Sequence, residues 1–106
     1  MKFLKTGDTI VSLANIKSIK VCKIKCYNTD TKIGYMGYQI KCFSQDEDDH
    51  IDYPGGGVEL TTLKPLTEVN PEIYLNQLMK MISTVPDYTT ISCMNEKTQE
   101  WELEVL

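Results

Sequence analysis

The strongest pattern of apolar and polar positions lies between residues 70 and 85. Apolar residues recur there at helical spacing, namely Tyr74, Leu75, Leu78, Met79, Met81, Ile82 and Val85. Asn70 suits an N-cap, Pro71 suits the first helical position, and Pro86 stops the pattern. The segment therefore predicts one amphipathic helix over about residues 70–85 that buries one face.

Most other patterned segments favour strands. Residue types typical of strands, separated by turn residues, occupy residues 2–5, 9–13, 16–27, 32–43 and 58–63. In the fourth segment the better core face consists of Met36, Tyr38, Ile40 and Cys42. Gly34 and Gly37 in that segment predict a bulge or the close approach of another segment.

The C-terminal region has the pattern of a hairpin with arms at residues 88–94 and 100–106. In its second arm Trp101, Leu103 and Val105 point one way and three glutamates the other. The whole pattern predicts an α+β fold, a mainly antiparallel sheet of about six or seven strands packed on the single helix, with a C-terminal β-hairpin. We expect one domain over residues 1–106, a length that supports its own core.

Composition changes this picture little. Apolar residues make up 42% of the chain and charged residues 25%, which is ordinary for a soluble globular protein. No run approaches the length of a membrane span, and residues 1–5 are too short and too charged for a signal peptide, so we expect a cytoplasmic protein. The four cysteines then fit buried or edge thiols. Cys22 and Cys26 would lie about 13 Å apart on a strand, too far to form a disulfide.

Charge is unevenly distributed along the chain. All eleven basic residues are lysine, and the net charge is −4. Residues 1–41 carry a net charge of +6, whereas residues 42–106 carry −10. A molecule with one basic and one acidic side is therefore expected.

The densest acidic segment does not have the spacing of a metal site. It contains Asp46, Glu47, Asp48, Asp49 and Asp52. Counted from Asp46, the sixth and twelfth positions of a calcium loop would be Ile51 and Gly57 instead of glycine and glutamate. His50 is the only histidine, so a transition-metal site lacks a second imidazole. We expect no metal.

No catalytic or nucleotide-binding set emerges from the remaining motifs. Gly55–Gly57 precede a strand rather than a helix and lack the Lys-Ser or Lys-Thr pair of a phosphate loop. A single histidine without a recognisable nucleophile gives no acid-base or covalent machinery. We therefore expect a protein that is not an enzyme and needs no cofactor.

One resemblance bears on function. The segment from Phe3-Leu4-Lys5 through Asp8-Thr9-Ile10-Val11-Ser12 to Ile19 resembles the start of small PH-like proteins of low-GC Gram-positive bacteria and their mobile elements. Gly56-Gly57-Val58-Glu59-Leu60 is similar to the last strand of that group. The resemblance implies a non-enzymatic scaffold and no particular functional residues. The group usually ends in its helix, whereas this chain continues into the predicted hairpin.

The acidic residues after position 41 suggest how the protein binds a partner. Glutamates at alternate strand positions lie about 7 Å apart, close to the spacing of phosphates along a nucleic-acid strand. The predicted partner-binding residues are Asp46, Glu47, Asp48, Asp49, Asp52, Glu96, Glu100, Glu102 and Glu104. We expect a non-catalytic phage or mobile-element protein that inhibits a host nucleic-acid-processing or immune protein, in the manner of anti-CRISPR proteins, through this acidic surface.

Two alternatives stay open. A PH-like housekeeping interaction module would bind its partner at a sheet edge or beside the helix, through Tyr35, Tyr38 or Tyr53. A nucleic-acid binder would use a lysine face with stacking tyrosines, formed by Lys17, Lys20, Lys23, Lys25, Lys32, Tyr27 and Tyr35. The missing arginine and the negative net charge disfavour direct nucleic-acid binding.

Overall fold

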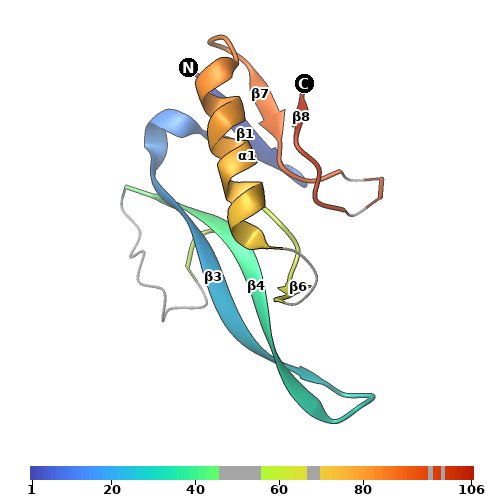
Figure 1. Cartoon of the computed structure of the whole chain (residues 1–106). Coiled ribbons are helices and arrows are strands. Elements are labelled where there is room, and N and C mark those ends of the chain that lie inside the picture. The colour runs from blue at the N-terminus through green and yellow to red at the C-terminus, as the bar shows by residue number, and fades with distance from the viewer. Residues whose placement is uncertain (46–55, 67–69, 96, 99) are drawn as a thin grey trace.

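A computed structural model of the chain describes residues 1–45, 56–66, 70–95, 97–98 and 100–106 (Figure 1). Its elements in chain order are β1 (Phe3–Thr6), β2 (Thr9–Ser12), a 3-10 turn (Leu13–Asn15), β3 (Ile16–Asn28), β4 (Ile33–Ser44), β5 (Val58–Glu59), β6 (Lys64–Pro65), α1 (Pro71–Thr84), β7 (Thr90–Ser92) and β8 (Glu104–Val105). The predicted α+β class is confirmed. In the described residues the helix α1 does not reach the length and apolarity of a membrane span.

The eight strands of the described residues form two sheets, where the sequence predicted one. The first sheet has the order β2-β1-β7-β8, and the second has the order β3-β4-β5 with β6 also paired to β4. All pairs are antiparallel except β1 with β7. The parallel pair places β7 beside β1, so the C-terminal hairpin joins the sheet that the N-terminal strands begin.

The helix α1 forms as its local sequence predicts. Asn70 caps it, with Oδ1 accepting a hydrogen bond from the Glu72 backbone N–H at 3.0 Å, and Pro71 begins the first turn. Tyr74 and Leu78 are buried, whereas Met79 is 53% exposed and lies outside the core face. The helix therefore buries a narrower stripe than predicted.

The core lies where α1 packs over the two sheets. Its buried cluster comprises Leu4, Ile40, Cys42, Leu60, Tyr74, Leu78, Ile91 and Cys93. Tyr38, Ile40 and Cys42 of β4 are buried as predicted, but Met36 is 39% exposed because β3 and β4 extend beyond the helix (Figure 1). Lys41 on the opposite face of β4 is also buried, and its Nζ donates to the Gly56 carbonyl at 3.3 Å.

Gly37 marks a close approach of another segment, as predicted. A Cβ atom at this position would lie 2.9 Å from Cδ1 of Leu63 and 3.0 Å from Sγ of Cys26. Gly37 pairs with Pro65, so β6 lies beside β4 in an antiparallel pair at this point. The register irregularity in this hairpin lies between Ile16 and Ser18, not at either glycine of β4.

The C-terminal hairpin exists but is shorter than predicted. Asn95 and Glu100 form an isolated bridge, and β8 contains only Glu104 and Val105. Between them Trp101 turns inward, with its ring centroid 4.9 Å from that of Tyr38 and 5.1 Å from that of Tyr74. Val105 was expected to face the core, but it is 54% exposed because it lies in the edge strand of the first sheet.

Candidate interaction surface

The distal part of the β3–β4 hairpin projects from the molecule. We call residues 23–36 the arm. Figure 1 shows it extending away from α1 and from the first sheet, and the molecule measures 47 × 31 × 23 Å along its principal axes. Four large apolar or aromatic side chains on the arm are exposed, namely Tyr27 (61%), Ile33 (63%), Tyr35 (39%) and Met36 (39%).

The strand register assigns these side chains to two faces. Lys25 pairs with Met36 and Tyr27 pairs with Gly34, so Lys25, Tyr27 and Met36 share one face. Because Gly34 has no side chain, the residue paired with Tyr27 does not cover the Tyr27 ring. Tyr35 lies on the other face, opposite Cys26. A surface with lysine, tyrosine and methionine side by side suits contact with a macromolecule.

The tip of the arm is held by its own hydrogen bonds. Asn28 Oδ1 accepts from the backbone N–H groups of Asp30 at 2.9 Å and Thr31 at 3.3 Å. The Lys32 N–H donates to the Asn28 carbonyl at 2.8 Å, and Lys32 adopts a φ of 58°. This turn was predicted from its residue types. The arm is therefore formed before any partner binds.

The five lysines of the predicted lysine face do not all lie on one face of the sheet. Lys23 and Lys25 are exposed and lie on the same side of β3, whereas Lys20 lies on the opposite side. Lys17 lies at the register irregularity, and Lys32 lies in the turn. Strands β3 and β4 contain no acidic residue, so the arm is basic overall despite Asp30 in its turn.

A pocket of about 530 Å³ opens on the arm, lined by Lys25, Cys26, Gly34, Tyr35 and Met36. Desolvation, and then the neighbouring Cys26 thiol, raise the pKa of the Tyr35 hydroxyl.

Of the nine predicted acidic site residues, six lie outside the described residues: Asp46, Glu47, Asp48, Asp49, Asp52 and Glu96. Glu100 and Glu104 are exposed, whereas Glu102 is half-buried and its Oε2 accepts a hydrogen bond from Asn95 Nδ2 at 2.8 Å. Because the segment between Glu100 and Glu104 leaves the ladder, the three glutamates do not form one regular strand row. Two of the three are available to a partner.

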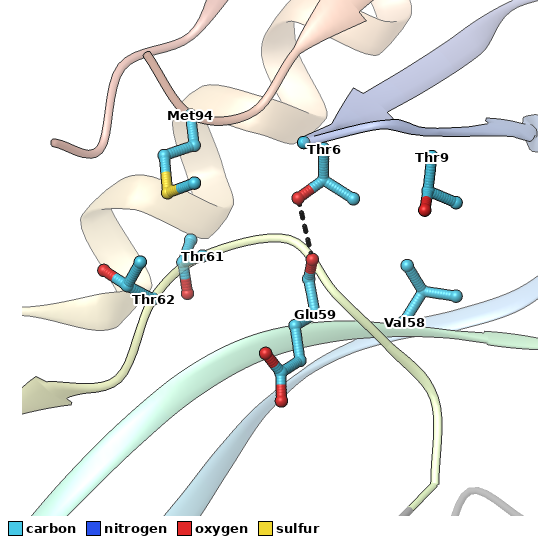
Figure 2. Close-up of a pocket in the computed structure, with 8 residues that line it drawn as sticks. Thr6, Thr9, Val58, Glu59, Thr61, Thr62 and Met94 are labelled. Carbon is cyan, nitrogen blue, oxygen red and sulfur yellow. Dashed lines mark hydrogen bonds between the residues drawn. The ribbon is translucent and has the colours of Figure 1, made fainter. Parts of the chain in front are cut away.

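A second pocket of about 300 Å³ lies where the two sheets meet (Figure 2). The Thr6 hydroxyl donates to the Glu59 carbonyl at 2.8 Å, and the buried Thr61 hydroxyl accepts from the Ile40 N–H at 3.0 Å. Figure 2 shows the Glu59 carboxylate turned away from Thr6. The Thr6 hydroxyl thus joins the end of β1 to the second sheet, and among the described residues that line the pocket there is no acid-base pair. No sequence motif indicated this pocket.

A third pocket of about 400 Å³ lies at the start of α1, lined by Val21, Lys23, Leu66, Asn70, Pro71 and Glu72. The Asn70 side chain already caps the helix, and Glu72 brings a negative charge. This pocket therefore does not form an anion site.

None of the four cysteines forms a disulfide, and within the described part of the chain no group of three or more acidic, cysteine or histidine side chains could hold a metal ion. Cys22, Cys42 and Cys93 are buried and Cys26 is half-buried. Burial, and then the neighbouring Cys42, raise the pKa of Cys93 from 9.0 to about 12. A thiol that resists ionisation is a poor nucleophile or metal ligand.

This pKa shift predicts a loss of stability in alkali. Between the two pKa values the unfolded chain has released the Cys93 proton and the folded chain has not, so the free energy of unfolding falls as the pH rises from about 9 towards 12. Urea unfolding at increasing pH measures this fall. In a Cys93→Ala variant the slope should be shallower, and an unchanged slope would contradict the assignment to Cys93.

No protein-family model matches this sequence, and comparisons with curated proteins and with solved structures found no significant match. The resemblance to PH-like proteins therefore stays a prediction. Function is therefore inferred from the surface of the molecule itself.

Proposed function

We propose that this is a non-catalytic protein-binding protein and that the arm makes the contact with its partner. The observation that carries the proposal is the exposure of Tyr27, Ile33, Tyr35 and Met36 on one preformed hairpin. Exposed apolar side chains gathered on a projecting element are typical of interaction sites. A hairpin that only closed the fold could end near Tyr38, where the contacts with Trp101 are made.

The acidic-surface hypothesis remains a second candidate. Glu100 and Glu104 are exposed at the first sheet, and Figure 1 shows β8 at the opposite end of the molecule from the tip of the arm. If the partner is a basic host protein that processes nucleic acid or serves in immunity, these residues would contribute to the contact, in a cytoplasmic phage or mobile-element inhibitor. Because the two surfaces are separate, substitutions can test them independently.

The test is capture of partners from a lysate of the organism that encodes the chain, with nuclease treatment to exclude nucleic-acid bridges. The arm variant carries Tyr27→Ser and Met36→Ser, and the matched variant carries Glu100→Gln and Glu104→Gln. We expect the arm variant to lose about tenfold in affinity for the captured protein, because a few interface residues, often tyrosines, contribute most of the binding energy and methionine is enriched at interfaces. The glutamate variant should bind as the original does.

Two outcomes would contradict the proposal. Loss of capture in the glutamate variant alone would assign the contact to the acidic surface. Capture by the arm variant as strong as capture by the original protein and by the glutamate variant would show that the arm does not make the contact. Urea unfolding of both variants controls for folding, and the substitutions lie at exposed positions where small effects on stability are expected.

A further inference from the structure

Strand β3 is an edge strand. It pairs with β4 on one side, and no strand of the described residues pairs with its other side. Along the arm this outer side runs from Lys23 to Tyr27. An edge strand presents backbone N–H and C=O groups that another extended segment can pair with.

The side chains along this edge alternate in chemistry. Lys23, Lys25 and Tyr27 point to one face of the sheet, and Ile24 and Cys26 point to the other. A strand added beside β3 would place its own alternate residues next to these two sets. Acidic residues would then pair with the lysines, and apolar residues would pack beside Ile24 and Cys26.

We propose that the partner contributes an extended segment in which acidic and apolar residues alternate, and that this segment adds a strand along β3 at residues 23–27. The inference rests on the proposed function, since it names the kind of partner the arm binds. Glu72 lines the same pocket as Lys23, so Lys25 is the stronger contact for an acidic side chain.

Nucleic acid fits this edge less well. Phosphates would satisfy the lysines, but they would leave the outer backbone edge of β3 unpaired and would offer no apolar neighbour to Ile24 and Cys26. Residues 16–44 carry a net charge of +5, and the rest of the chain carries −9. A long polyanion would meet that negative remainder, whereas a short acidic strand contacts the arm alone.

The test uses a short fluorescein-labelled peptide in which glutamate alternates with valine. Fluorescence anisotropy compares it with a peptide of the same composition in two blocks, with the alternating peptide N-methylated at every residue, and with a single-stranded oligonucleotide. We expect the alternating peptide to bind about tenfold more tightly than either control peptide, because only it offers both the register of side chains and the backbone donors.

A charge exchange tests the register. A variant with Lys23→Glu and Lys25→Glu should bind the glutamate peptide about tenfold more weakly and should gain binding to a peptide in which lysine alternates with valine. The matched control carries Lys80→Glu and Lys97→Glu, exposed positions on α1 and in the C-terminal turn that give the same change in net charge. The control should bind as the original does.

The remaining outcomes overturn the inference. Equal binding of the block or N-methylated peptide would show attraction by charge without strand pairing. Binding of the oligonucleotide alone would assign the arm to nucleic acid, and no binding of any probe would leave the lysines as protection of a sheet edge. If the arm variant loses its captured partner while the alternating peptide fails to bind, the proposed function stands and only the strand-addition inference falls.

Discussion

Replacing Trp101 with alanine is expected to lower the free energy of unfolding by about 3 kcal/mol. Its ring contacts Tyr38 of β4 edge to face and Tyr74 of α1 at a tilt, so it joins the C-terminal segment to both the helix and the second sheet. Removing the ring would leave a cavity between elements that are far apart in the sequence. Urea unfolding followed by circular dichroism measures the change.

Trp101→Phe is the matched control. The indole N–H is buried and has no hydrogen-bond partner in the part of the chain that the structure describes. Phenylalanine removes that group and keeps an aromatic ring, so we expect a loss below about 1.5 kcal/mol. An alanine variant as stable as the original would show that the C-terminal segment does not complete the core.

The second large effect is expected for Gly57→Ala, a loss of about 3 kcal/mol. Gly57 has a φ of 82°, a backbone conformation that residues with a side chain rarely adopt. A Cβ atom at this position would lie 2.8 Å from Cε1 of Phe43 and 3.1 Å from the Cys42 carbonyl oxygen. The substitution therefore combines backbone strain with a collision against a buried ring and a strand backbone.

Gly7→Ala separates these two causes. Gly7 also has a positive φ, 56°, but nothing lies within 4 Å of a Cβ atom there. We expect a loss of about 1 kcal/mol from strain alone. The difference between the two variants, measured by urea unfolding, then gives the cost of the collision with Phe43. Equal losses would mean that Phe43 moves aside at no cost.

The sequence predicted the elements whose causes are local. Asn70 and Pro71 begin α1 through contacts within one turn, and Asn28 forms the arm's turn with its next residues. The pairing of Phe3 with Thr90 has no such signature, because it joins residues far apart in the chain. The sequence therefore predicted one sheet where there are two.

Which residues are buried was harder to predict than which residues share one face of a strand. Alternation correctly grouped Met36 with Tyr38 and Ile40, but it could not show that β4 extends past the elements that cover it. The sequence predicts an exposed side chain for Lys41. The residue is buried because its Nζ donates a hydrogen bond to the Gly56 carbonyl of another segment. The acidic residues were predicted from their charge, whereas the exposure of the arm depends on which elements lie over it, and composition does not encode that.

The central position of β1 in the first sheet has a consequence for synthesis on the ribosome. Strands β3 and β4 can pair once residue 44 has been made, but β1 acquires its neighbour β7 only after residue 92. Translation proceeds at about 5–20 residues per second, so β1 waits several seconds with one side unpaired. The nascent chain thus carries an open strand edge from residue 12, where β1 and β2 are complete, to residue 92, which is about three-quarters of its synthesis and the period in which a chaperone would bind it.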